Sequence, residues 1–170
     1  MTGNEVEVGR VKSMKVRAWT ALLASLTVGA AFAVTTPVTT ILAEPVGPKV
    51  SVWSGVYTQA QSKRGETVHS SACAMCHGLR LNGAGQPDQP ASPAIARAGF
   101  LRKWEGKTVG ELFTLVRGTM PTDNPGTLTD QQYIDAIAHM FAVSDIAAGD
   151  KELPPDPKVL EGIVINAQKK

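Results

Sequence analysis

The chain has 170 residues, of which 43% are hydrophobic and 19% are charged, a composition typical of one ordinary globular domain. Its 17 basic and 15 acidic side chains give a net charge of +2, but residues 1–43 hold four of the basic and two of the acidic ones, so residues 44–170 are neutral. This balance gives no support to nucleic-acid binding, and two cysteines are too few for a disulfide-dense secreted scaffold.

Residues 1–43 have the pattern of an export signal. Lys15 and Arg17 form a basic region ahead of an apolar run, and Ala31-Phe32-Ala33 has the small residues of a cleavage site. We therefore expect an exported, periplasmic protein. The apolar run is close to the minimum length that crosses a bilayer, so a retained membrane anchor is the alternative to a cleaved signal peptide.

The rest of the chain predicts an all-α fold with long loops. Residues 44–52 have a linker composition, residues 53–165 form the expected domain, and residues 166–170 are a tail. No strand alternation of useful length is present. The predicted helices are Val52 to about Ala72, one after a capping box at Thr108, one after a capping box at Thr129, and a short one near Lys158–Glu161 capped by Asp156.

Both cysteines lie in one pentapeptide, Cys73-Ala-Met-Cys76-His77, which is the attachment signature of c-type haem. Its spacing suits the chemistry, because two thiols add to the two haem vinyl groups and the adjacent histidine binds the iron. We therefore expect one covalently bound haem c.

Three other interpretations of this motif are weaker. A thioredoxin-like redox pair needs a βαβ context that the sequence does not predict. A zinc site needs a third and a fourth ligand at matching spacing, and the chain has no second cysteine pair. A disulfide between positions three apart closes too small a loop to stabilise the chain much.

The second axial ligand of the iron is expected to be Met120. It precedes Pro121 in an irregular segment that can present a side chain away from the attachment site. His139 and Met140 are the alternatives, but neighbouring helical positions point about 100° apart, so at most one of them faces inward. A thioether ligand closes the sixth position, which argues against oxygen or peroxide chemistry.

Several further motifs accompany the haem signature across roughly residues 53–165. They are Gly65, Gly78 after the haem histidine, Pro93-Ala-Ile95, Phe100-Leu-Arg-Lys-Trp104-Glu-Gly-Lys-Thr108, Thr119-Met120-Pro121, Pro125-Gly126-Thr-Leu-Thr-Asp-Gln-Gln-Tyr133 and Glu152-Leu-Pro154. With these motifs the sequence resembles the class I c-type cytochromes. More narrowly, it resembles the single-haem cytochromes associated with pyrroloquinoline-quinone-dependent alcohol dehydrogenases.

The resemblance implies a class I cytochrome c fold, with about three main helices around one haem and the first and last of them crossing at Gly65. It implies that the Pro93 carbonyl accepts the Nδ1–H of His77, and that Trp104 donates its indole N–H to a haem propionate. Two positions depart from the family pattern, since His69 and His139 replace aromatic residues. We expect these imidazoles to be neighbours that weaken the helix crossing at acid pH.

The expected function is that of a periplasmic one-electron carrier and not of an enzyme. The donor would be a dehydrogenase, and the acceptor a terminal oxidase or another cytochrome. A dedicated cytochrome subunit of a quinoprotein dehydrogenase complex is the first alternative, and an open-site haem sensor or enzyme is the second. Contact with a membrane is expected only if the leader is retained.

Overall fold

The computed structural model describes residues 49–83, 88 and 92–168. The predicted export signal, its cleavage site and most of the predicted linker lie outside these residues. The chain divides into two units, residues 1–41 and residues 42–170, and every described residue belongs to the second. No helix among the described residues is long and apolar enough to cross a membrane.

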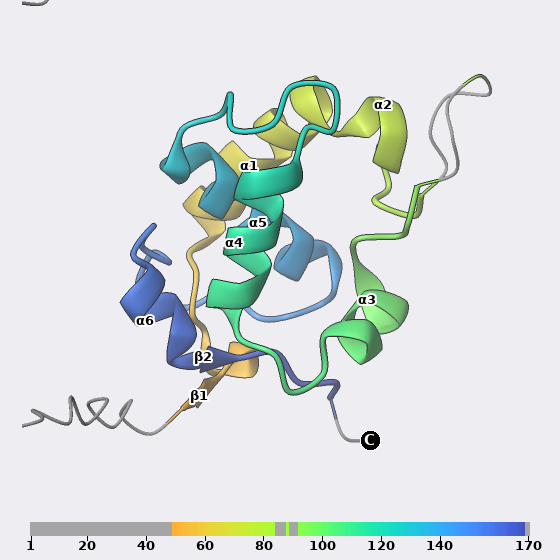
Figure 1. Ribbon diagram of the computed structural model, residues 1–170. Helices are drawn as coiled ribbons and strands as arrows, with labels where there is room; N and C mark the ends of the chain where they lie inside the picture. The colour runs from red at the N-terminus through yellow and green to blue at the C-terminus, as the bar shows by residue number, and fades with distance from the viewer. Residues whose placement is uncertain (1–48, 84–87, 89–91, 169–170) are drawn as a thin grey trace, which may run out of the picture. The chain divides into compact units, whose positions relative to one another are not determined.

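Helices dominate the described part of the chain, and the only strands there are two residues long (Figure 1). The parallel pair of strands joins the two ends of the domain, with Val50 opposite Ile163. In chain order the elements are β1 (Val50–Ser51), a 3-10 turn (Val52–Ser54), α1 (Gln59–Ala72), α2 (Ala74–His77), α3 (Arg97–Trp104), α4 (Val109–Thr119), α5 (Asp130–Val143), α6 (Pro157–Glu161) and β2 (Ile163–Val164).

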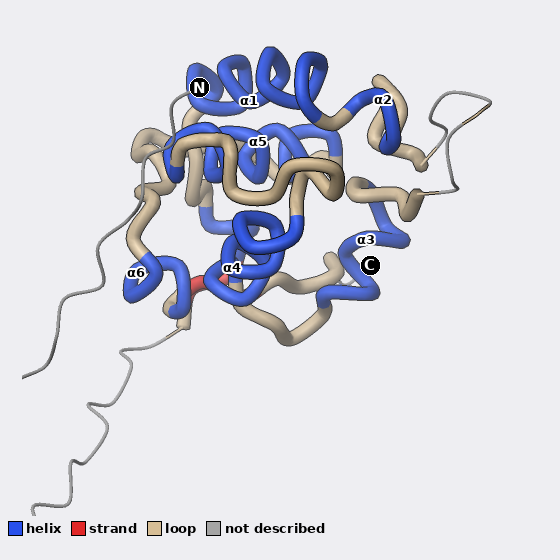
Figure 2. The backbone as a smooth tube through the Cα atoms, turned by 45° about the horizontal axis from the view of Figure 1, so that its top comes forward, coloured by secondary structure: helices blue, strands red, loops and turns tan. Residues whose placement is uncertain are grey.

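The centre of the fold is the crossing of α1 and α5, which lie against each other in Figure 2. At Gly65 the backbones are so close that a Cβ atom would lie 1.8 Å from the carbonyl oxygen of Asp135 and 2.9 Å from the Cβ of His139. Only glycine can occupy this position without moving a helix. The predicted crossing at Gly65 is therefore confirmed.

The three predicted caps are also confirmed. In the box that begins α4, the Glu111 amide donates to the Thr108 hydroxyl at 3.1 Å and the Thr108 amide donates to the Glu111 carboxylate at 2.7 Å. The box of Thr129 and Gln132 begins α5 in the same way. Asp156 accepts from the Lys158 amide and begins α6, which is the expected short helix.

The start of the first helix differs from the prediction. A 3-10 turn from Val52 ends at Gly55, which has a φ of +70°, and α1 begins only at Gln59. The Thr58 hydroxyl caps α1 by accepting from the Gln61 amide at 3.1 Å. The side chain of Gln61 does not complete a capping box, because it donates to and accepts from the backbone of Leu153.

Helix α3 was not predicted, and its start explains why. No side chain of its own segment caps it, since the residue at its N-cap is Ala96. The Arg97 amide donates instead to the hydroxyl of Ser144, at 2.7 Å and far along the chain. A helix that is capped by a tertiary contact leaves no local start signal in the sequence.

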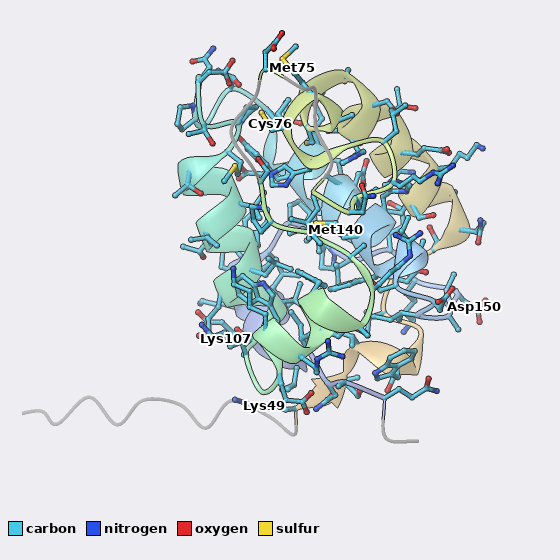
Figure 3. The ribbon with its side chains drawn as sticks, turned by 90° about the vertical axis from the view of Figure 1, so that its right-hand side faces the viewer. Lys49, Met75, Cys76, Lys107, Met140 and Asp150 are labelled. Atoms are coloured by element: carbon cyan, nitrogen blue, oxygen red, sulfur yellow. The ribbon has the colours of Figure 1, made fainter. Side chains whose placement is uncertain are left out.

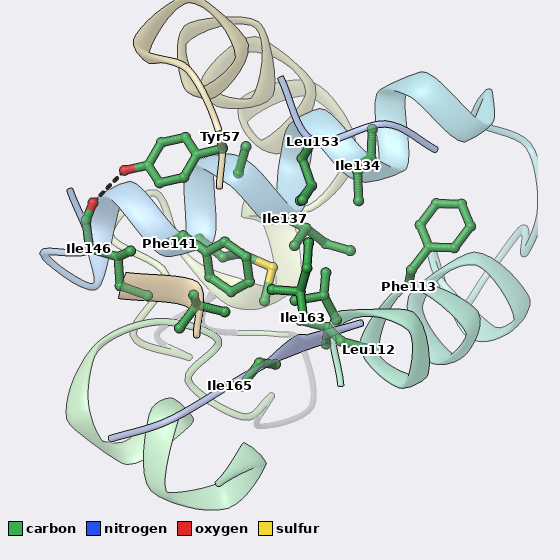
Figure 4. Close-up of a cluster of buried hydrophobic side chains, with 14 of the residues drawn as sticks. Tyr57, Leu112, Phe113, Ile134, Ile137, Phe141, Ile146, Leu153, Ile163 and Ile165 are labelled. Atoms are coloured by element: carbon green, nitrogen blue, oxygen red, sulfur yellow. Dashed lines mark hydrogen bonds between the residues drawn. The ribbon is translucent and has the colours of Figure 1, made fainter. Parts of the chain in front are cut away.

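The core is built mainly from aliphatic side chains of α4, α5 and the C-terminal segment, as Figure 4 shows. Residues 44–170 contain seven aromatic residues, and the fold already uses all of them. Five are buried and two are packed against the core while partly exposed: Tyr57, Phe100, Phe113, Tyr133 and Phe141, then Trp53 and Trp104.

Candidate haem site

The haem signature occupies a single helical turn at the end of α1. The Cys73 amide still bonds the carbonyl of His69, at 2.9 Å, as the last turn of α1. The amides of Cys76 and His77 then both bond the carbonyl of Cys73, which forms the turn of α2. Two thiols and one imidazole are therefore carried on one short rigid piece of backbone.

His77 is oriented by a backbone carbonyl. Its Nδ1 lies 3.0 Å from the carbonyl oxygen of Pro93, the hydrogen bond that the resemblance implied. A carbonyl oxygen only accepts, so Nδ1 carries the proton and the lone pair of the neutral ring is on Nε2. This is the tautomer that a metal-binding histidine needs.

Pro93 is brought to His77 by a close approach of two loop segments. The Gly83 amide bonds the His77 carbonyl at 2.9 Å, and the Ile95 amide bonds the Leu81 carbonyl at 2.9 Å. Gly83 has a φ of +79°, and a Cβ atom there would lie 2.3 Å from the carbonyl oxygen of Ser92. Glycine is thus required at this position for the contact that orients His77.

Cys73 and Cys76 are free, half-buried thiols. Burial raises the pKa of the Cys73 thiol, and the neighbouring Cys76 adds to the rise. The nucleophilic cysteine of a redox pair needs a lowered pKa, so the thioredoxin-like alternative is disfavoured. No group of three or more metal-ligating His, Cys, Asp or Glu side chains occurs in the described ranges, so the zinc alternative gains no support.

These residues fit haem c. The attachment chemistry needs two unpaired thiols on one side of a histidine whose Nε2 is unprotonated, and this turn supplies all three.

Met120 is the C-cap of α4 and begins the loop that leads to α5. Its side chain is half-buried, and its sulfur accepts a hydrogen bond from the Thr122 hydroxyl at 3.4 Å. Met140, in contrast, is buried in the core, and Figure 3 shows it in the interior while Met75 points outward. Figures 1 and 3 place α2 and the end of α4 toward the same end of the molecule.

Trp104 lies at the end of α3, half-buried against the core. Its ring centroid is 6.3 Å from that of Phe100, and the Lys107 ammonium lies 5.2 Å from its centroid on the ring face. Among the described residues the indole N–H of Trp104 has no hydrogen-bond acceptor. Its role toward a haem propionate stays a prediction.

The two unusual histidines meet at the helix crossing, as expected. The ring centroids of His69 and His139 are 5.7 Å apart. His69 donates from Nε2 to the carbonyl of Gly78, at 2.9 Å. Burial is the main cause that lowers the pKa of both imidazoles, and the charge of His69 lowers that of His139 further.

Tyr133 is a site residue that the sequence analysis did not identify. It is buried in the first turn of α5, and its hydroxyl donates to the Met120 carbonyl at 2.7 Å. The same oxygen accepts from the Gly126 amide at 3.1 Å. The only local signal was its place shortly after the Met-Pro loop, which does not reveal the direction of its side chain.

Comparison with known proteins gives one family match, and the haem signature lies within it. Residues 60–140 match the family model described as "Cytochrome C oxidase, cbb3-type, subunit III", a match that includes α1, the haem signature and most of α5. No curated protein and no solved structure gives a significant match to the chain. The match supports a c-type cytochrome, a class of proteins that transfer electrons through haem c, and the helical structure has the all-α class I cytochrome c fold.

Proposed function

We propose that the chain is a single-haem cytochrome that carries one electron at a time between proteins of the periplasm. Cys73 and Cys76 would hold the haem by two thioether bonds, formed when each S–H adds across one vinyl C=C bond. His77 would bind the iron through Nε2. The observation that carries this proposal is the orientation of His77 by Pro93, beside two free thiols on the same turn.

Met120 is our proposed second axial ligand. Of the three alternatives, Met140 is packed in the core and His139 lies against His69 at the helix crossing. Met120 is the one that is half-buried at a loop, with a sulfur engaged only by the Thr122 hydroxyl among the described residues. Loop presentation lets this sulfur reach a metal without disturbing the packed helices.

If His77 and Met120 both held the iron, the site would suit electron transfer and would leave no open position for a substrate. Haem c, when bound, supplies an iron that changes between the ferric and ferrous states. The residues of the chain hold its ligands fixed in both states. His77 donates its Nδ1–H to the Pro93 carbonyl, and this hydrogen bond would keep the imidazole in one orientation in both states.

Two exposed apolar side chains flank His77 and support a docking role for this face. Met75 and Leu79 are 64% and 74% exposed, the two highest values among the large hydrophobic residues of the described chain. Redox encounters use small, transient interfaces of this kind. We propose a periplasmic dehydrogenase as electron donor and a terminal oxidase or another cytochrome as acceptor.

A dedicated subunit of a respiratory complex is the second candidate. The matched family model is described as an oxidase subunit, and the sequence also resembles cytochromes that accompany quinoprotein alcohol dehydrogenases. A free carrier exchanges between partners, whereas a subunit copurifies stably with one complex. Affinity purification of the chain from its own cells at low and high salt separates these two functions.

Optical spectra of the reduced and oxidised protein test the ligand assignment. The wild type is expected to show low-spin haem in both states, and Met120→Ala is expected to become high-spin and to bind carbon monoxide when reduced. Met140→Leu is the matched control and is expected to leave the spectrum unchanged, because Met140 is a core residue. A low-spin spectrum in Met120→Ala would overturn the assignment.

A further inference from the structure

The loop between α4 and α5 is held at few points. Side chains from Thr122 to Thr127 are exposed. Within the loop, the Asn124 amide bonds the Pro121 carbonyl at 3.0 Å and the Thr127 hydroxyl bonds the Asn124 carbonyl at 2.9 Å. These short-range bonds shape a turn but do not fasten it to the rest of the fold.

Tyr133 connects this loop to helix α5 through hydrogen bonds of its hydroxyl. Its side chain is 1% exposed, so the hydroxyl is held in one place by the packing of α5. From there it donates to the carbonyl of Met120 at 2.7 Å and accepts from the amide of Gly126 at 3.1 Å. One buried oxygen therefore ties the first residue of the loop and its far turn to the same helix.

The turn at Gly126 depends on this arrangement. Gly126 has a φ of +75°, a conformation that few other residues adopt readily. Its amide points back at the Tyr133 hydroxyl, and no atom outside its chain neighbours lies within 4 Å of where a Cβ would be. The space beside Gly126 is open at its Cβ position, and its amide is held by the Tyr133 hydroxyl.

We propose that Tyr133 is a positioning residue for the Met120 thioether, which it holds ready for the iron by fixing the backbone of Met120 itself. This inference rests on the proposed function. Ordering a loop costs conformational entropy. Because the Tyr133 hydroxyl bonds the carbonyl of Met120 itself, it restricts the backbone of the residue whose side chain has to be positioned. Losing the hydroxyl leaves the Met120 carbonyl and the Gly126 amide without their partner and shifts the loop toward released conformations.

Tyr57 is a matched control for Tyr133. It is also a buried tyrosine, 2% exposed, and its hydroxyl also donates to a backbone carbonyl, that of Ile146 beyond the end of α5 (Figure 4). Tyr57→Phe and Tyr133→Phe therefore remove the same atom from two buried sites. Only the second site touches the loop that carries Met120.

Imidazole binding to the ferric holoprotein measures how readily Met120 leaves the iron, because an external ligand binds only the released fraction. We expect imidazole to bind Tyr133→Phe roughly fivefold to thirtyfold more tightly than wild type, the range for losing one or two hydrogen bonds. Tyr57→Phe is expected to stay within about twofold of wild type while its thermal stability falls comparably. Met120→Ala gives the upper limit of the affinity.

Amide hydrogen exchange tests the same positioning role without a substitution at Tyr133. If Tyr133 couples Met120 to Gly126, releasing the ligand by Met120→Ala must speed exchange of the Gly126 amide in the holoprotein. Unchanged exchange there, or wild-type imidazole affinity in Tyr133→Phe, would overturn the positioning role and leave the proposed function intact. Equal imidazole affinity in wild type and Met120→Ala would overturn both, because Met120 would then not be a ligand.

Discussion

The α1–α5 crossing and the Met120–Thr129 loop are neighbouring regions with opposite construction. The crossing is closed by backbone contact at Gly65 and by an Arg64–Asp135 ion pair with an Nε–Oδ2 distance of 2.8 Å. The loop is exposed along most of its length and fastened mainly through Tyr133. One region is a scaffold built from the chain alone, and the other carries Met120, the side chain that we propose as a ligand of the cofactor.

This difference predicts that the two regions depend on different sources of stability. The scaffold carries a strong charge network, in which Arg64 also bonds Glu152 at 2.9 Å. Bonds to Asp135 and then to Glu152 raise the pKa of Arg64, and Arg64 lowers the pKa of Glu152. The Met120–Thr129 loop has no comparable charge network in the described residues. Its stability is expected to come from the bond between Met120 and iron.

Removing haem should destabilise the Met120–Thr129 loop much more than the α1–α5 crossing, and this is the largest effect that we expect. A chain with Cys73→Ala and Cys76→Ala cannot hold haem covalently, and we expect its melting temperature to fall by about 10 °C or more, since ligand binding adds to folding free energy. Hydrogen exchange should show protection lost first in residues 120–129, while amides at the crossing keep measurable protection. Equal loss of protection in both regions would contradict the division.

Gly65→Ala should strongly destabilise the α1–α5 crossing. Its Cβ would overlap the Asp135 carbonyl, and we expect a loss of about 3 kcal/mol or more in urea unfolding of the holoprotein. Gly118→Ala in α4 is the control, because nothing lies within 4 Å of its Cβ position, and it should stabilise by about 0.5–1 kcal/mol. Similar effects of the two variants would argue against the close crossing.

Arg64→Met should weaken the scaffold less. Asp135 has a side chain only 5% exposed and would lose its cation, but Arg64 is 45% exposed, so solvent screening limits the loss to about 1–2 kcal/mol. Lys63→Met removes the exposed pair with Glu66 and should cost less than about 0.5 kcal/mol. Urea unfolding at neutral pH measures both variants, and equal costs would show that burial of Asp135 is unimportant.

The smallest effect is expected from the histidine pair. Because the folded-state pKa values of His69 and His139 are lowered, the unfolded chain binds more protons, and stability falls as pH drops from about 7 toward 5. His77 disfavours protonation of His69, whereas Glu66 favours that of His139. His69→Phe with His139→Tyr should flatten this slope in urea unfolding. An unchanged slope would contradict the prediction.

Local signals predicted much of the scaffold. The boxes of Thr108 and Thr129 and the cap at Asp156 are readable from short stretches of sequence, whereas the crossing at Gly65 was expected from the family resemblance. A capping pattern also stood at Thr58-x-x-Gln61 and marked the true start of α1. This pattern is hard to recognise because residues on both sides of it have helical composition. The side-chain amide of Gln61 also bonds the distant backbone of Leu153 and not the N-cap.

What the sequence could not predict depends on contacts between distant segments. Helix α3 starts on the hydroxyl of Ser144, and the Met120 loop is tied to Tyr133 across a turn of irregular backbone. The His77–Pro93 bond was anticipated only through the family resemblance, since the intervening loop gives no periodic pattern. Side-chain direction in such segments is set by tertiary packing and not by local propensity.

The mass of the intact, fully denatured protein tests the central claim most directly. If Cys73 and Cys76 form thioether bonds, the purified chain will carry the added mass of one haem after unfolding and extraction in acid solvent. The variant with both cysteines changed to alanine will show the polypeptide mass alone. A wild-type chain at the bare polypeptide mass, isolated from cells that assemble other c-type cytochromes, would contradict the account.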